Sequence, residues 1–110
     1  MGLLTNGPSD LQRRKIAVIG LERLLDAVAI SQEIGVSKPA GDAYRRAAQM
    51  LGCEPDETAM VGDQVEGDVE GPLRAGYRLA VLVGGRPARL PPGGVEVRAL
   101  SDVFDCLVDV

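Results

Sequence analysis

The sequence predicts an α/β fold built on a parallel sheet, and two features indicate it. Four short apolar segments recur along the 110 residues, with helical patterns between them. The apolar segments show little polar–apolar alternation, which is typical of strands buried on both faces of a parallel sheet. Ligands of such sheets bind outside the carboxyl ends of the strands, so the residues that follow each strand are the candidates for chemistry.

The expected strands are short and rich in β-branched residues, and they span residues 3–5, 27–30, 58–61 and 79–83. A first helix is expected over residues 8–19, with Gly20 as its stop. The clearest helix covers residues 42–51, where four apolar residues share one face. These four are Tyr44, Ala47, Ala48 and Leu51.

The second half of the chain is less regular. A short helix follows Asp68 and is expected to start, or to kink, near Gly71, because Pro72 cannot lie deep inside a helix. Glycine and proline predict a loop over residues 84–94. Ser101 is the expected N-cap of a last helix.

Composition narrows the possible functions. The net charge is −4 and no basic cluster stands out, so we expect no nucleic-acid partner. The chain has no histidine, and Cys53 and Cys106 lie far apart, which excludes a zinc site of the Cys/His type. No apolar run is long enough for a membrane span. Free thiols without a secretion signal predict a cytoplasmic location.

Polar residues that suit an anion follow the first two strands. Thr5, Asn6 and Gly7 combine a hydroxyl, an amide and a flexible backbone, and the helix that follows is expected to add N-terminal amides as a phosphate cradle. A plain Asn-Gly turn is the alternative. Lys38, before Pro39, is placed to neutralise a phosphoryl oxygen, although a simple surface charge is also open.

Two carboxylates follow the third strand. Gly62 allows a tight turn at the strand end, and Asp63 and Asp68 lie five residues apart on the loop after it. Such a pair suits Mg²⁺, which takes one or two carboxylates together with water and phosphate. The alternative is an acidic loop that caps the next helix.

These segments resemble the haloacid dehalogenase-like hydrolases in order and spacing. Residues 3–7, ending in Thr5-Asn6-Gly7, resemble the family's second motif, and Lys38-Pro39 resembles its third. Residues 60–63, with Asp68, resemble the fourth. A flavodoxin-like or receiver-like domain is a weaker reading, because it needs an acidic pair where Thr5 and Asn6 stand.

The resemblance implies a Rossmann-like sheet and Mg²⁺-dependent hydrolysis of a phosphate ester on a small phosphorylated metabolite. Thr5, the Asn6–Gly7 backbone and Lys38 would hold the phosphoryl group, with Thr5 and Lys38 taking part in catalysis. Asp63 would bind Mg²⁺, and Asp68 would be a ligand or would support one. In the family an aspartate of an Asp-x-Asp-x-Thr motif, on a central strand, attacks phosphorus.

The chain departs from the family pattern in two respects. No Asp-x-Asp-x-Thr occurs in these 110 residues, and Gln64 stands where the family commonly has Ser or Thr. We therefore expect residues 1–110 to be a partial core domain without a cap, opening within its first strand and inactive alone. A complementing N-terminal chain or a homo-oligomer would be its partner. The alternative function is a non-catalytic module that binds phosphate or Mg²⁺, or that oligomerises.

Overall fold

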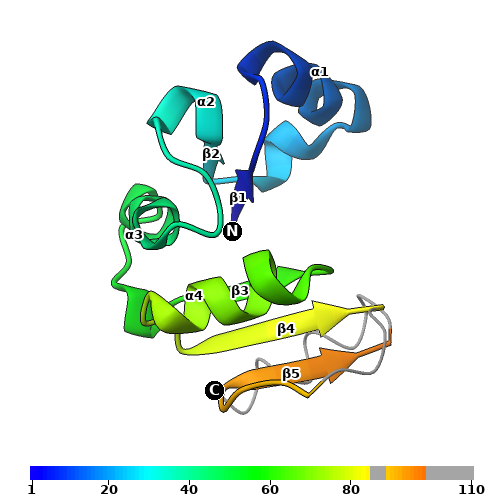
Figure 1. The fold of residues 1–110 in the computed structure, drawn as a ribbon. Coiled ribbons are helices and arrows are strands. Elements are labelled where there is room, and N and C mark those ends of the chain that lie inside the picture. The colour runs from blue at the N-terminus through cyan, green and yellow to red at the C-terminus, as the bar shows by residue number, and fades with distance from the viewer. Residues whose placement is uncertain (85–88, 99–110) are drawn as a thin grey trace. The chain divides into compact units, whose positions relative to one another are not determined.

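The computed structural model describes residues 1–84 and 89–98, which form parallel strands with flanking helices (Figure 1). The predicted α/β class is confirmed. The chain divides into two compact units, Met1–Glu54 and Pro55–Val110. Each unit contains its own parallel sheet.

The first unit is built on two parallel strands, β1 and β2, paired so that Thr5 lies opposite Ile30. Its elements are β1 (Gly2–Thr5), α1 (Ser9–Ile19), the 3₁₀ helix η1 (Leu21–Leu24), β2 (Ala27–Ile30), α2 (Ser31–Ile34) and α3 (Gly41–Met50). Because the strands are parallel, the segments that follow Thr5 and Ile30 leave the sheet at the same edge. This edge carries the polar residues of the candidate site.

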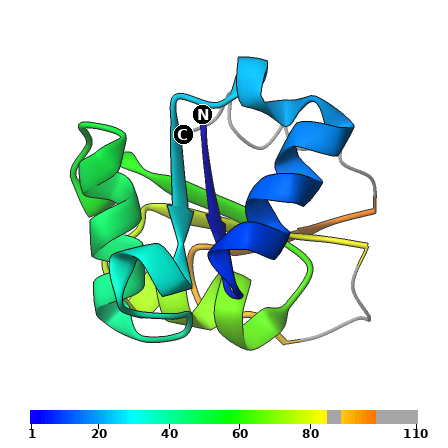
Figure 2. The same cartoon turned by 90° about the horizontal axis from the view of Figure 1, so that it is seen from above.

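Helix α3 supplies much of the core of the first unit. It packs against β1 and β2, and Figure 2 shows α1 and α3 flanking the two strands. Tyr44 and Ala48 are fully buried, whereas Ala47 and Leu51 are partly buried. The apolar face predicted for this helix is therefore confirmed, and burial of such side chains is the main favourable term in folding.

The second unit has a three-stranded parallel sheet in the order β3-β4-β5. Its elements are η2 (Pro55–Glu57), β3 (Ala59–Gly62), the π-helical turn η3 (Glu66–Glu70), α4 (Gly71–Arg74), β4 (Leu79–Val83) and β5 (Gly94–Val97). One face of the sheet packs Ala80 and Leu82 against Val69. Leu79 and Val81 form a second cluster on the other face, as expected for a strand buried on both sides.

Most predicted boundaries agree with the structure to within a residue or two. The strands predicted at residues 27–30 and 79–83 coincide with β2 and β4, and α4 begins at Gly71. The loop prediction for residues 84–94 missed that Gly94 opens β5. Glycine and proline predict a loop locally, but β5 is held by its backbone pairing with β4. The predicted last helix and Cys106 lie outside the described residues.

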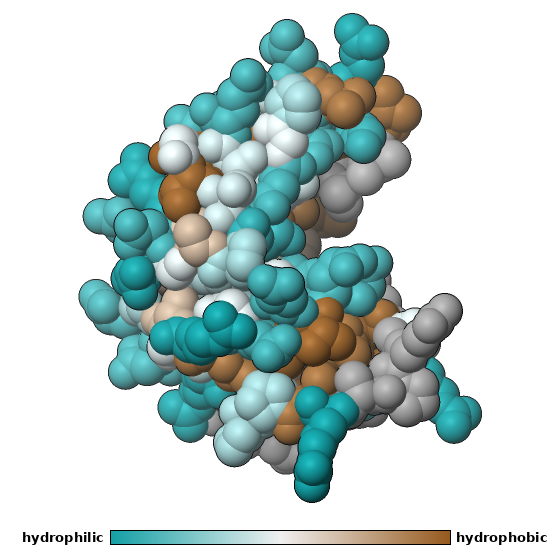
Figure 3. Space-filling model, in the orientation of Figure 1, coloured by the Kyte–Doolittle hydropathy of each residue, from teal (hydrophilic) through white to brown (hydrophobic). Residues whose placement is uncertain are grey.

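The surface of the first unit is mostly hydrophilic in the view of Figure 3. Apolar side chains reach the surface over the end of α1 and η1, and the exposed large apolar residues of this stretch include Val18 and Leu24. In the described part of the chain, no helix has the length and apolar character needed to cross a membrane.

Candidate active site

The Thr5–Gly7 turn and the Lys38 loop are joined by a reciprocal pair of hydrogen bonds. The side-chain Nδ2 of Asn6 donates to the carbonyl oxygen of Lys38 at 3.0 Å. The backbone N–H of Lys38 donates to Oδ1 of Asn6 at 2.9 Å. The third predicted motif is thereby held next to the second within the first unit, although 32 residues separate Thr5 from Lys38.

The Asn6 side chain makes different hydrogen bonds from the ones that the sequence predicts. The sequence suggested that this amide would donate to an anion, yet both its oxygen and its nitrogen bond the Lys38 backbone. These two contacts orient the side chain of Asn6, because an amide pairs its nitrogen with an acceptor and its oxygen with a donor. Asn6 therefore holds the backbone of Lys38 in place.

Side chains of α2 accept hydrogen bonds from backbone amides that the sequence suggested for a phosphate cradle. The N–H of Gly7 donates to Oγ of Ser31 at 2.8 Å, and the N–H of Ser9 donates to Oε1 of Gln32. The first amides of a helix have no intrahelical partner, so a side chain that reaches them satisfies groups that would otherwise need water or a ligand. These two amides are thus engaged within the protein.

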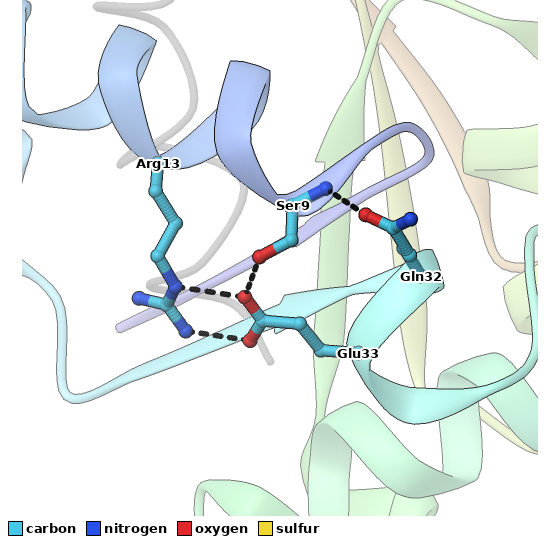
Figure 4. Close-up of polar contacts among 4 residues, drawn as sticks. All are labelled: Ser9, Arg13, Gln32 and Glu33. Atoms are coloured by element: carbon cyan, nitrogen blue, oxygen red, sulfur yellow. Dashed lines mark hydrogen bonds and ion pairs between the residues drawn. The ribbon is translucent and has the colours of Figure 1, made fainter.

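An ion-pair network ties α1 to α2 (Figure 4). Arg13 binds Glu33 with two hydrogen bonds, of 2.8 Å from Nε and 2.6 Å from Nη2, and the hydroxyl of Ser9 also donates to Glu33. The hydrogen bonds from Arg13, followed by the one from Ser9, lower the pKa of Glu33 to about 2. A bidentate arginine–carboxylate pair fixes orientation as well as distance.

The acidic loop of the second unit is organised by Asp68. Its carboxylate is buried, with 4% of the residue exposed, and its Oδ2 accepts the backbone N–H groups of Asp63 at 3.2 Å and Gln64 at 3.0 Å. Asp68 therefore shapes the turn that carries Asp63, whose own side chain is exposed. Gln64, at the position where the resembled family has Ser or Thr, contributes its backbone amide.

Gly62 is required for this arrangement. A Cβ built at Gly62 would lie 2.3 Å from Cγ of Asp68, well inside van der Waals contact. The absence of a side chain at Gly62 therefore lets the Asp68 carboxylate reach the amides of the turn. The sequence indicates only a tight turn at Gly62, whereas the close approach of Asp68 is the stronger constraint.

The carboxylates of this loop suit the ligands that a protein commonly supplies to Mg²⁺. Asp63 and Asp68 offer hard carboxylate oxygens on one turn, and Mg²⁺ commonly takes one or two carboxylates and completes its shell with water and phosphate. Among residues 1–84 and 89–98, no three His, Cys, Asp or Glu side chains gather as a fuller metal-binding cluster. The chain can thus supply part of a Mg²⁺ shell, with the remaining ligands from elsewhere.

Sequence reasoning missed several residues that support these loops. No role was predicted for Ser31, Gln32 and Glu33, yet they form α2, which binds the start of α1. Gln12, in α1, contacts Thr5 and the carbonyl of Asn6. The predicted parallel sheet could have pointed to these residues, because parallel pairing brings the segments after Thr5 and Ile30 to the same C-terminal end of the sheet.

Comparison with known proteins identifies the family. Residues 1–76 match the haloacid dehalogenase-like hydrolases, a hydrolase family. The chain belongs to this family. The haloacid dehalogenase-like (HAD-like) chain is also similar to a phosphoserine phosphatase of Thermus thermophilus, with 39% identity over 106 residues, covering 94% of the chain and 43% of that protein.

Further relatives are phosphatases with differently named substrates. A glyceraldehyde 3-phosphate phosphatase of Methanopyrus kandleri is 38% identical over 99% of the HAD-like chain and 45% of its own length. An N-acylneuraminate-9-phosphatase of Rattus norvegicus is 33% identical over 98% of the chain and 48% of its own length. The HAD-like chain spans about half the length of the curated relatives it matches.

Solved structures agree with this assignment. A HAD phosphatase from Thermococcus onnurineus has a TM-score of 0.86 at 31% identity, covering 96% of the HAD-like chain and 49% of the solved chain. A 2-haloacid dehalogenase from Pseudomonas syringae has a TM-score of 0.81 at 26% identity, covering 98% and 46%. The fold is therefore shared by phosphatases and dehalogenases, so the reaction must be argued from the site.

Proposed function

We propose that this chain supplies the phosphate-holding and magnesium-binding groups of a HAD-like phosphatase. The observation that supports the proposal is the pair of hydrogen bonds between Asn6 and the Lys38 backbone, which holds that backbone beside the Thr5–Gly7 turn. A hydroxyl and a lysine on two adjoining loops suit a phosphoryl group, because they offer neutral and charged donors to its oxygens. The phosphatase relatives support this reaction over carbon–halogen cleavage.

Each proposed role follows from the chemistry of the group. The Thr5 hydroxyl and the backbone N–H of Asn6 bind phosphoryl oxygens, and Lys38 offsets their charge as it grows during transfer. Gly7 completes the turn, with its own N–H bonded to Ser31. Asp63 binds Mg²⁺, and Asp68 shapes the turn that presents it. When bound, the ion neutralises phosphate charge and orients the ester. The substrate class is a small phosphorylated metabolite, as the names of the relatives suggest.

Binding of inorganic phosphate to the 110-residue chain tests the first half of this proposal. Lys38→Met should weaken phosphate binding about ten- to hundredfold, since a charge-assisted hydrogen bond contributes roughly 1.5–3 kcal/mol. Lys15→Met is the matched control, because Lys15 is exposed on α1. Equal phosphate affinity in both variants would refute the role of Lys38.

Magnesium binding tests the second half separately. Asp63→Asn should weaken Mg²⁺ binding, followed through the amide signals of residues 62–68, whereas Glu66→Gln removes an exposed neighbouring charge and should leave binding nearly unchanged. If the two variants lose Mg²⁺ affinity equally, the ion responds only to the overall charge of the loop. The assignment to Asp63 would then be wrong.

We further propose that these residues hydrolyse no aryl phosphate by themselves, because no Asp-x-Asp-x-Thr nucleophile motif occurs among them. A complementing chain with that motif, or a second copy, is the proposed partner. In the described part of the chain β1 and β3 each have one strand neighbour, and an open edge can pair with another strand. Turnover by the isolated chain that survives Asp63→Asn would contradict this account.

The second candidate is a non-catalytic module that binds phosphate or Mg²⁺. It is favoured if the chain remains monomeric and a chain carrying Asp-x-Asp-x-Thr restores no turnover. Dynamic light scattering and an aryl phosphate assay on the mixture separate the two candidates. The exposed free thiol of Cys53 supports the proposed cytoplasmic location, since reduced thiols persist in reducing compartments.

A further inference from the structure

Gln12 lies in the first turns of α1 and reaches back to the end of β1. Its Nε2 is 2.7 Å from the carbonyl oxygen of Asn6 and 3.1 Å from Oγ1 of Thr5. One nitrogen therefore serves two oxygens of the proposed phosphate-binding turn. None of the motifs includes Gln12, and the proposed function does not use it.

The orientation of the Gln12 amide follows from its partners. A backbone carbonyl can only accept, so the atom of Gln12 that faces the Asn6 carbonyl at 2.7 Å must be the nitrogen. The same nitrogen carries a second hydrogen, which is available to Thr5 Oγ1. The Thr5 hydroxyl thus receives a hydrogen bond from Gln12.

Space for this contact depends on Gly7. A Cβ built at Gly7 would lie 2.8 Å from Nε2 of Gln12, and Gly7 has a φ of +139°, which side-chain-bearing residues rarely adopt. The backbone N–H of Gln12 is itself bonded to the carbonyl of Pro8 at 3.1 Å. The helical backbone therefore fixes the position of Gln12, and the absence of a side chain at Gly7 leaves room for its amide.

Receiving a hydrogen bond changes what the Thr5 hydroxyl can offer. A hydroxyl has one proton and two lone pairs, and Gln12 occupies a lone pair and leaves the proton for another acceptor. Among the described residues its acceptor is the Asn6 carbonyl, which is 3.5 Å away, at the outer limit of a hydrogen bond. A phosphoryl oxygen would be a better acceptor.

We propose that Gln12 is a positioning residue that keeps Thr5 in the role of a hydrogen-bond donor to a phosphoryl oxygen. This inference rests on the proposed function, because it assumes that Thr5 binds the anion. The glutamine does not touch the ligand. It sets the direction of the Thr5 hydroxyl proton before the anion arrives, which removes a reorientation cost at binding.

The test uses sulfate, because it keeps one charge state between pH 4 and pH 7 and offers the same oxygen acceptors. Binding to the 110-residue chain is followed by the amide signals of Thr5, Asn6 and Gly7. Gln12→Met removes the donor at similar volume and should weaken sulfate binding about three- to tenfold, the value of one hydrogen bond. In a Thr5→Val background, the same change should have no further effect.

A pH comparison separates hydroxyl orientation from a merely structural role. Gln12→Glu places an acceptor beside Thr5 at pH 7, and near pH 4 the carboxyl gains a proton and becomes a donor again. Sulfate affinity of this variant should recover on acidification by more than that of Leu11→Glu. Leu11 is exposed on the same helix, so that control carries the same charge without facing Thr5.

The outcomes distinguish this inference from the proposed function. If Thr5→Val weakens sulfate binding but Gln12→Met does not, the role of Gln12 is overturned and the phosphate site stands. If Thr5→Val binds sulfate as the unaltered chain does, the phosphate site itself fails. If Gln12→Met unfolds the chain, the test still stands, because the recovery of sulfate affinity on acidification is measured within the single variant Gln12→Glu. Equal recovery in Gln12→Glu and Leu11→Glu would overturn the inference.

Discussion

At the scale of single residues, the site is governed by side chains that hold other groups in place. Asn6 holds the backbone of Lys38, and Asp68 holds the amides of Asp63 and Gln64. In both cases a polar side chain forms hydrogen bonds with the backbone of a neighbouring loop residue. The cost of leaving such partners unsatisfied is what fixes the loops.

Asn6→Leu tests the first of these contacts. The change keeps the approximate volume and removes both hydrogen bonds, so we expect a loss of about 1–2 kcal/mol from the local stability of the Lys38 loop. Hydrogen exchange of the Lys38 amide measures it directly, because that N–H donates to Asn6. Asn6→Asp keeps the acceptor and should lose less protection. Unchanged Lys38 exchange in Asn6→Leu would contradict the clamp.

Gly62→Ala tests the second contact. The added methyl group would overlap the carboxyl carbon of Asp68, so the loop must shift, at a cost of about 1–3 kcal/mol. Gly67→Ala is the matched control, since a Cβ at Gly67 meets no atom within 4 Å. Urea denaturation compares the two variants. Similar stability in both would show that Asp68 moves aside without penalty.

At the scale of elements, the short helix α2 links the end of β2 to the start of α1 within the first unit. It follows β2 directly, and three of its four residues bond the turn before α1 or α1 itself. A helix of one turn has little intrinsic stability. Its side-chain contacts with the Gly7–Arg13 segment are therefore what hold it, and they also hold the phosphate-binding turn.

The pH dependence of the Arg13–Glu33 pair belongs to this scale. The pKa of Glu33 falls from 4.5 to about 2 on folding, so the unfolded chain takes up this proton first as the pH falls. The contribution of the pair is fully present above pH 4.5 and is lost as the pH falls toward 2. Urea midpoints of the unaltered chain and Glu33→Gln should therefore differ above pH 4.5 and converge below it. A constant difference would contradict the pairing.

At the scale of the whole molecule, net charge acts together with the strand edges that lack a neighbour among residues 1–84 and 89–98. The chain carries a net charge of −4 at pH 7 and has a pI of about 4.7. Repulsion between copies vanishes near that pH, and an edge strand with unpaired backbone groups can then associate with another copy. The low pKa of Glu33 keeps its ion pair with Arg13 intact at pH 4.7. Loss of this pair would therefore not be the cause of self-association.

We therefore expect self-association to peak near pH 4.7, measured by light scattering. Val61→Lys should suppress it more than Val18→Lys does. Both residues are exposed and both changes add one charge, but only Val61 lies on an edge strand, β3. Equal suppression would mean that charge alone controls association.

Much of this protein follows from its sequence without coordinates. Hydrophobic segments and turn residues predicted the α/β class, β2, β4 and the buried face of α3, because these depend on local periodicity. The motifs around Thr5, Lys38 and Asp63 predicted the family, which the comparisons confirm. Their proposed roles in binding phosphate and Mg²⁺ remain predictions.

Only the tertiary structure decided which groups touch. The bonds of Asn6 to Lys38, of α2 to the start of α1, and of Gln12 to Thr5 join residues whose own types do not reveal their partners. Strand β5 was likewise missed, because its pairing with β4 outweighs the loop tendency of its glycine. The physical reason is common to all: a hydrogen bond depends on distance and direction in space, and these arise only when the chain has packed.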